Sequence, residues 1–576
     1  MSQTTVVRGG LIVDGTGAAP YEGDVAIQGS TIVAVGKNLP AGDHEEDARD
    51  HLVTPGFVDI HTHYDAQATW STRMSPSSSH GVTTAVLGNC GVGFAPCRAG
   101  DREALIHLME GVEDIPEAVM AAGLPWDWES FPDYLDSLDQ RSRDIDLACY
   151  LPHSPLRVNV MGQRGLDREP ATEADMARMR ELAGEAMRAG AMGFSTSRLS
   201  VHRDVAGNLI PSHRVAEDEL TAIAQGVAEG GGGLLQVVFD SQEQGGILSE
   251  LESYGRVARA SKQPVSFSLA QSPGVPHLWR RILDEVEAMN RGGLKVSAQV
   301  LPRPVGMLMG LDISLNPFSL CPSWSKVAGL APAERVVAMR EPELRAALLS
   351  EQPGLPNQPL FKMARRFHMI FELGDPPNYE PDPSESITAR AERAGVEPLE
   401  FAYDLLVSGK GDTLLFIPIA NYAEGNLEAV RAMLSHPDVT MGLGDGGAHY
   451  GVVCDSTFTT FALTHWARDR ASGRLPLEEV VRLMSHDPAR RAGLNDRGRL
   501  ARGYKADLNI IDLDRLRLKA PHILRDLPGG GRRISQDAEG FVATFVSGAA
   551  IRRRDASTDA TPGAVVRGRR LAPAQA

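Results

Sequence analysis

The 576-residue sequence predicts an α/β protein with a parallel sheet in its middle and β structure at both ends. Between about residues 55 and 490, short apolar runs typical of buried strands alternate with stretches of helical periodicity. This alternation favours either a (β/α)8 barrel or a doubly wound sheet. The two ends instead carry short β-branched runs separated by Gly, Asp and Pro. Because such pieces are too small to stand alone comfortably, we expect them to meet in one small β domain.

The chain is therefore divided into residues 1–54 and 497–576, which form the small β domain and a tail, and residues 55–496, which form the α/β domain. Amphipathic helices are expected at 172–189, 217–229 and 278–290. The expected strands of the α/β domain are 53–60, 83–87, 146–151, 191–195, 233–239, 265–269, 294–299, 414–419 and 440–443.

Two segments depart from this alternation. Residues from about 302 to 400 carry Pro, Met and Trp around one or two helices, which is typical of an inserted lid or small subdomain. Residues from 556 onward are expected to form a loose, partly basic tail.

Composition limits the classes of partner and compartment. The net charge of −16 argues against nucleic acid or an anionic membrane as the main partner. No apolar run is long enough to cross a bilayer, and the N-terminus lacks the pattern of a signal peptide. The five scattered cysteines show no zinc-finger spacing, so we expect reduced thiols in a cytoplasmic protein. No G-x-G-x-x-G follows the first strand, which argues against dinucleotide binding.

The first signal for chemistry is the stretch Val53–Asp65, which reads VTPGFVDIHTHYD. Side chains alternate along a strand, so His61 and His63 point to the same side, close enough to share a metal ion. For a bare His-x-His, two polar residues in a loop are the simpler interpretation. The remaining ligands must come from elsewhere in the chain.

Two residues beyond other strands are candidates for those ligands. Asp445 follows an apolar run and lies among glycines that permit close approach, which suits a metal ligand or a proton shuttle. Its alternative role is to cap a turn. Cys90 comes just after the strand at 83–87, where its thiolate would lie near the two histidines. The alternative interpretation of Cys90 is an unreactive residue of the hydrophobic core.

Further polar residues follow other strands and are candidates for substrate binding. His153 and Arg157 could hold a substrate carboxylate, because a guanidinium makes two parallel hydrogen bonds with one. Ser195 has a similar position, and His449 or His465 could also reach the site. Each of them could equally have a structural role, with its polar atoms hydrogen-bonded inside the protein.

Together these motifs resemble the metal-dependent amidohydrolase superfamily, and more narrowly its N-acyl-D-amino-acid deacylase (D-aminoacylase) family. The match rests on V-x-P-G-F-x-D-x-H-x-H, Gly88-Asn-Cys-Gly, His153-x-x-Leu-Arg, Ala189-Gly-Ala-Met-Gly-Phe-Ser-Thr, Gly444-Asp-Gly and Gly503-x-x-Ala-Asp. The resemblance implies a (β/α)8 barrel with a small β domain built from both termini. It also implies zinc-dependent hydrolysis of an N-acyl-D-amino acid to a carboxylate and a D-amino acid.

The same resemblance places the family's His-x-His on His61 and His63, its cysteine ligand on Cys90 and its catalytic aspartate on Asp445. Two further histidine ligands of the family, on middle strands, are missing from this chain. The corresponding stretches 234–239 and 264–268 contain no histidine, and Gln236 or Gln271 would replace imidazole poorly.

The residues that remain are sufficient for one divalent metal ion, zinc before others, and a water. We therefore predict a metal-dependent hydrolase of a linear amide whose substrate also carries a carboxylate. The alternatives are an amidohydrolase for a cyclic amide, an imide or a nucleobase, and a barrel that only binds a ligand. The acyl group, the native metal and the number of subunits stay open.

Overall fold

Eight parallel strands form a barrel in the computed structural model, which describes residues 3–240, 246–354 and 363–574. The third strand is interrupted, so that β8 (Asp146–Cys149) continues as β9 (Leu151–Pro152). The other seven are β6 (Phe57–Asp59), β7 (Val82–Leu87), β10 (Gly193–Ser197), β11 (Leu234–Val238), β12 (Val265–Ser268), β13 (Val296–Val300) and β17 (Val439–Met441).

The pairing runs β6-β7-β8 and β9-β10-β11-β12-β13-β17. The ring closes just beyond the strands, where the Asp445 N–H donates to the His61 carbonyl at 3.1 Å and the His63 N–H donates to the Gly446 carbonyl at 2.8 Å. This arrangement decides between the two predicted sheets in favour of the (β/α)8 barrel.

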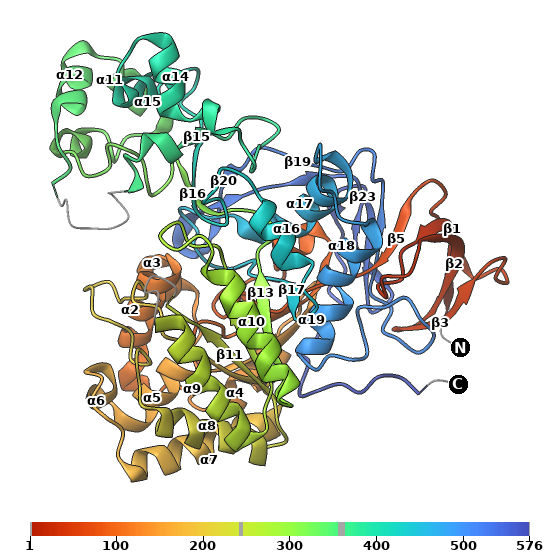
Figure 1. Ribbon diagram of the computed structural model, residues 1–576. Helices are drawn as coiled ribbons and strands as arrows, with labels where there is room; N and C mark the ends of the chain where they lie inside the picture. The colour runs from red at the N-terminus through yellow and green to blue at the C-terminus, as the bar shows by residue number, and fades with distance from the viewer. Residues whose placement is uncertain (1–2, 241–245, 355–362, 575–576) are drawn as a thin grey trace.

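Helices cover the outside of the barrel, as Figure 1 shows for α7 (Glu173–Ala189), α8 (Glu217–Glu229), α9 (Gly246–Ser261) and α10 (Leu278–Arg291). Three of them lie where the periodicity predicts them, within one residue at each end. Thr172 begins α7 with a reciprocal capping box to Asp175. Because the strands are covered on both faces, a strand such as β7 is buried at every position.

Both ends of the chain contribute to one nine-stranded sheet. The N-terminal strands are β1 (Thr4–Ile12), β2 (Tyr21–Gln28), β3 (Thr31–Gly36), β4 (His44–Asp47) and β5 (Leu52–Pro55). The C-terminal strands are β18 (Leu508–Ile511), β23 (Phe541–Val546), β24 (Ala549–Arg553) and β25 (Ala556–Ser557). The two groups join where β5 pairs antiparallel with β18. The prediction of a small β domain built from both termini is confirmed.

The insertion is a subdomain between β13 and β17, at the upper left of Figure 1. Its sheet consists of β14 (Val305–Met309), β15 (Phe371–Glu372) and β16 (Leu415–Ala420), all antiparallel. Its helices include α11 (Pro332–Met339), α12 (Pro342–Ser350), α14 (Ile387–Ala394) and α15 (Pro398–Leu406). It has a hydrophobic core of its own. Residues 355–362, inside the segment expected at 302–400, lie outside the described residues.

One expected barrel strand belongs to this subdomain. Residues 414–419 do form a strand, β16, but it pairs with β14 and β15 and not with barrel strands. The prediction of its place was wrong, because a short apolar run has the same appearance in any buried sheet.

The expectation of a loose C-terminal tail was also wrong. The Val566 N–H donates to the Leu147 carbonyl at 2.7 Å, and the Arg570 N–H donates to the Gly493 carbonyl at 2.8 Å. Val566 is buried, and Arg567 pairs with Asp136 at 2.6 Å. The tail is therefore ordered and packs along the outside of the barrel, where its backbone is hydrogen-bonded to β8. Among the described helices, none combines the length and the apolar character needed to cross a bilayer.

Candidate metal centre

Four of the predicted residues meet at the carboxyl ends of the barrel strands. His61 and His63 follow β6, Cys90 follows β7, and Asp445 follows β17. The two imidazoles and the thiol are buried, whereas the Asp445 side chain is 23% exposed. Asp445 is thus the member of the cluster that faces solvent. The carboxyl ends of the strands are where barrel enzymes place their catalytic groups.

The donor atoms of this cluster are close together. Cys90 Sγ lies 3.4 Å from His61 Nε2, and the ligand atoms of His61, His63 and Cys90 all lie within 4.8 Å of one another. Asp445 Oδ1 lies 3.5 Å from His61 Nε2 and 3.6 Å from His63 Nε2. Two nitrogens, one sulfur and one carboxylate oxygen therefore converge from three strands.

These separations fit a bound metal ion. Zinc lies about 2.0–2.1 Å from nitrogen and about 2.3 Å from sulfur, so tetrahedral ligand atoms lie about 3.3–3.6 Å apart. Both ring nitrogens of His63 are buried and accept or donate no hydrogen bond within the described residues. An unpaired buried polar atom is costly, and a metal ion on Nε2 would satisfy one of these two.

Burial governs the protonation of the donors. It lowers the pKa of His61 to about 3 and the pKa of His63 well below its usual value. It raises the pKa of the Cys90 thiol and of the Asp445 carboxyl well above their usual values. Burial therefore disfavours the charged form of each donor, and binding of a metal by the Cys90 thiolate must displace the thiol proton.

The backbone around the cluster is held in an uncommon conformation. Cys90, Asp445 and His449 have φ values of 54°, 47° and 52°, in the left-handed region that non-glycine residues rarely adopt. Such strain persists only where the surroundings fix it, and it is concentrated at functional sites. The last strand also approaches β6 closely, because a Cβ on Gly444 would lie 2.0 Å from Asp59 Oδ2.

Two hydrogen-bonded side chains hold the cysteine loop. Asn89 Nδ2 donates to the carbonyls of Thr62, at 3.1 Å, and Val86, at 2.8 Å. The Ser195 hydroxyl accepts from the Gly91 N–H at 3.2 Å and donates to the Gly88 carbonyl. Ser195 is fully buried. The structure thus gives this predicted substrate-binding residue a contact with the backbone on either side of Cys90.

His153 and Arg157, also predicted to bind substrate, are buried and have protein partners. His153 Nε2 lies 2.9 Å from Glu219 Oε1, and Arg157 Nε lies 3.4 Å from the same oxygen. His153 Nδ1 contacts the Thr196 hydroxyl at 2.9 Å. The guanidinium already has a carboxylate inside the protein, so this arrangement favours a structural role for the pair.

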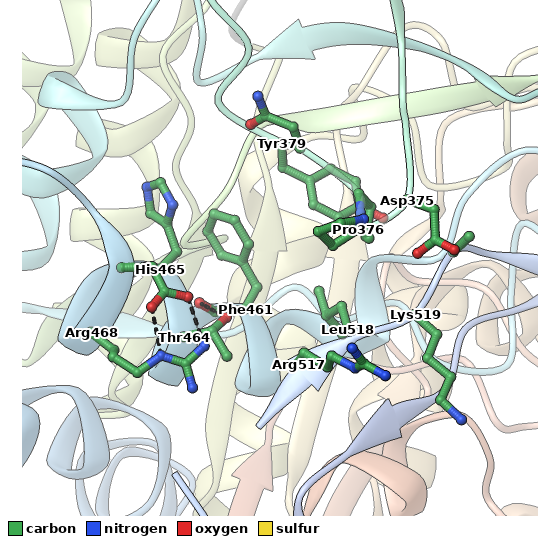
Figure 2. A pocket seen from close by; sticks show the side chains of 14 residues that line it. Asp375, Pro376, Tyr379, Phe461, Thr464, His465, Arg468, Arg517, Leu518 and Lys519 are labelled. Carbon is green, nitrogen blue, oxygen red and sulfur yellow. Dashed lines mark hydrogen bonds and ion pairs between the residues drawn. The ribbon is translucent and has the colours of Figure 1, made fainter. Parts of the chain in front are cut away.

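Of the two histidines that were predicted to be able to reach the site, His449 lies near it and His465 does not. His449 remains near it, with its side chain 27% exposed. His465 lies elsewhere, on the π-helix Ala462–Asp469, with Nε2 2.8 Å from Glu380 and its ring stacked on Phe461. Figure 2 shows that the side chains of His465, Phe461 and Tyr379 line the same pocket. This separate pocket has a volume of about 730 Å³ and is also lined by residues 375–378 of the insertion and by residues 517–520.

Two residues of the centre were missed by sequence reasoning. Glu113, the last residue of α2 (Arg102–Glu113), places Oε1 3.3 Å from His63 Nδ1. A lone glutamate in an amphipathic helix resembles a solvated residue, so nothing in the sequence distinguished it. His202 lies close enough to lower the pKa of His61 further. Its position soon after β10 was a usable signal.

The middle strands supply amides and hydroxyls where two histidines were expected from the resemblance. Gln236 on β11 places Nε2 3.4 Å from His61 Nδ1, on the side away from Cys90 and Asp445. Gln299 on β13 donates to the Ser266 hydroxyl on β12 at 3.0 Å. Gln271 instead contacts Asn421, Ala423 and Glu424. None of these groups is a strong zinc ligand.

The chain is similar to known deacylases in sequence and in fold. D-aminoacylase of Alcaligenes xylosoxydans xylosoxydans is 27% identical over 572 residues, which cover 97% of each protein. N-acyl-D-aspartate deacylase of the same organism is 35% identical over 194 residues, 33% of this chain and 36% of that protein. The solved N-acyl-D-glutamate deacylase of Bordetella bronchiseptica, complexed with zinc and a phosphonate inhibitor, superimposes with a TM-score of 0.65 at 22% identity over 99% of this chain and 100% of its own.

A solved D-aminoacylase gives the same TM-score of 0.65 at 23% identity, covering 98% of this chain and 99% of its own. The model of the amidohydrolase family matches residues 44–551, which contain the whole barrel, the insertion and the strands β4, β5, β18 and β23 of the small β domain. The chain belongs to the amidohydrolase family.

Proposed function

We propose that this protein is a metal-dependent hydrolase that converts an N-acyl-D-amino acid and water into a carboxylate and a free D-amino acid. The observation that carries the proposal is the convergence of His61, His63, Cys90 and Asp445 at metal-ligand separations. The relatives that span or partly span the chain are named as D-aminoacylase and N-acyl-D-aspartate deacylase, which supports this substrate class.

We assign the metal to His61, His63, Cys90 and Asp445, and expect one ion, zinc before others. Nitrogen and thiolate donors favour zinc over calcium or magnesium. A single ion is supported because β11 and β12 supply Gln236 and Ser266 instead of further imidazoles. When bound, a divalent metal polarises a carbonyl oxygen and makes water easier to deprotonate.

Asp445 has the position of the proton carrier. It lies against both histidines and is partly open to solvent, where a substrate amide can approach. Its carboxylate takes a proton from the attacking water and returns it to the leaving nitrogen as the C–N bond breaks. Burial raises the pKa of this carboxyl, which makes it a better proton acceptor than an ordinary aspartate.

Among the residues predicted to bind the substrate, His449 fits that role best. Its ring is partly exposed beside the cluster, whereas His153, Arg157 and Ser195 are buried and contact other groups of the protein. The insertion is a further candidate for holding the substrate carboxylate. The five described cysteines are free and buried, which supports our placing the reaction in the reducing cytoplasm.

The test is hydrolysis by the purified protein of N-acetylated D-amino acids, their L-enantiomers, hydantoins and cytosine. We expect activity on D-enantiomers, and loss of at least about 10³-fold in kcat for Asp445→Asn with an unchanged melting temperature. Hydrolysis confined to hydantoins or cytosine would contradict the substrate class. Full activity of Asp445→Asn would contradict the mechanism.

A further inference from the structure

Glu113 faces two histidines at once from the end of α2. Its Oε1 lies 3.3 Å from His63 Nδ1, and its Oε2 lies 3.5 Å from His449 Nε2. The Glu113 side chain is 1% exposed. Because His63 Nε2 faces Asp445, the His63 ring has one nitrogen toward the metal-donor cluster and the other toward Glu113.

The backbone of the same helix end holds the loop that follows Asp445. The Glu113 carbonyl accepts the His449 N–H at 2.5 Å, and Asp114 Oδ2 accepts the Gly451 N–H at 2.9 Å. Asp114 ends α2 in a left-handed conformation, with φ of 52°. The backbone that carries the Glu113 side chain is therefore held by contacts that do not involve a metal.

We infer that Glu113 is a positioning residue that fixes His63 as a metal ligand through Nε2 and holds His449 at the mouth of the site. Both of its contacts are ion-pair contacts, and the one to His63 does not meet hydrogen-bond geometry. Because an ionised carboxylate offers only acceptors, it favours the tautomer of each ring whose facing nitrogen carries the proton. That tautomer leaves the lone pair of His63 on Nε2, the atom beside Asp445. A carboxylate behind a ligand imidazole also makes it a stronger donor. The inference rests on the proposed function, because it presupposes the metal.

His61, the other histidine of the cluster, has an amide and not a carboxylate as its outer partner. His61 Nδ1 faces the side-chain amide of Gln236 at 3.4 Å. An amide carries no charge and can donate as well as accept, so it neither fixes the tautomer nor raises the basicity of its imidazole as a carboxylate does. His63 should therefore depend more on its outer partner than His61 does.

Glu113→Gln tests the inference, because the shape is kept while one acceptor oxygen becomes a donor. A glutamine can accept from only one of the two rings and must offer its NH₂ group to the other. We expect zinc and cobalt affinity, measured by chelator competition, to fall by ~10–100-fold. The cobalt complex at saturation should keep its thiolate charge-transfer band, which reports that Cys90 is still a ligand.

Glu219→Gln is the matched control, since Glu219 is equally buried on the same barrel and also contacts a histidine, His153. It should leave metal affinity within ~2-fold of the wild type. Should Glu113→Gln fail to fold, Glu113→Asp takes its place, because it keeps both acceptors but cannot reach both rings, and it should weaken binding as well.

Equal metal affinity of Glu113→Gln and the wild type would overturn the inference, and so would an equal loss in Glu219→Gln. The proposed function fails separately. A wild-type protein that binds zinc tightly but hydrolyses no N-acyl-D-amino acid would contradict the substrate class and leave the role of Glu113 intact.

Discussion

At the scale of single residues, burial decides which form of each titratable group the fold accepts. Burial disfavours the charged forms of His61, His63 and Cys90, and a metal ion could contact the donor atoms of all three at once. These three side chains are therefore better suited to binding a metal ion than to acting as separate acids and bases. His80 shows the same effect outside the metal site, where it can be measured alone.

His80 predicts part of the pH dependence of stability. It is fully buried, with Nδ1 2.7 Å from the Thr460 hydroxyl and Nε2 2.8 Å from the Gln536 carbonyl. Burial lowers its pKa to about 4. Between about pH 6.5 and pH 4 the unfolded chain binds a proton that the folded chain does not, so stability falls as the pH falls, by up to about 3 kcal/mol.

The measurement is the urea midpoint of unfolding at about pH 7 and about pH 5, in the wild type and in His80→Gln. Glutamine can donate and accept at the same place but does not titrate. The difference between the two midpoints should therefore be smaller in the variant. An identical difference in both proteins would show that His80 does not contribute.

Some residues of the metal centre could be predicted from the sequence and others could not. His61, His63, Cys90 and Asp445 were predictable as a group, because each follows an apolar strand and barrel strands end at one face. Glu113 was not, because its contact with His63 depends on how α2 packs above the barrel. His153 and Arg157 follow a strand as well, but Glu219, far away in sequence, occupies them.

At the scale of elements, the glycine-rich turn after β17 brings Asp445 against β6. Gly444 lies so close to Asp59 that a Cβ would be 2.0 Å from Oδ2, and Asp59 Oδ1 in turn accepts the His61 N–H at 3.1 Å. The sequence predicted glycines that permit close approach here. The structure adds the identity of the neighbour, which is the strand that carries the histidines.

Gly444→Ala should therefore separate Asp445 from His61. We expect kcat to fall by at least about tenfold, since misplacement by ~1 Å can cost as much as 10². Gly274→Ala is the control, because a Cβ there meets nothing within 4 Å and the glycine has no positive φ. Activity of Gly444→Ala equal to that of the control would contradict the proposed tight closure.

Elements were easier to predict than their pairing. The helices at 172–189 and 217–229 follow from their periodicity, and both are present. The strand at 414–419 was correct as a strand and wrong as part of the barrel. Local sequence determines whether a segment can be a buried strand, whereas its neighbour depends on the folding of the whole insertion.

At the scale of the whole molecule, the C-terminal segment links the barrel to the small β domain. Residues 563–570 bond to Arg143, Leu147, Gly190 and Gly493 through their backbones. A buried ion cluster adds a second link, in which Asp146 on β8 pairs with Arg497 at 2.7 Å and with Lys505 at 3.0 Å. The basic composition of the tail suggested a loose segment, so this contact with the barrel was not predicted.

Removal of residues 563–576 should consequently lower the melting temperature by at least a few degrees, because it exposes backbone groups of β8 and removes the buried side chains of Val565 and Val566. A shorter truncation that removes only the residues after Leu571, which is 87% exposed, serves as the control. Differential scanning calorimetry measures both. Equal melting temperatures would show that the tail contributes no stability.

Whether this barrel holds one catalytic metal ion with a reduced set of histidines can be decided from the metal content of the purified protein. Elemental analysis should find close to one divalent ion per chain in the wild type, and far less in a His61→Ala/His63→Ala double variant whose circular dichroism spectrum shows that it is folded. A fully active protein that contains no metal, or a double variant that retains the full metal content, would contradict the account.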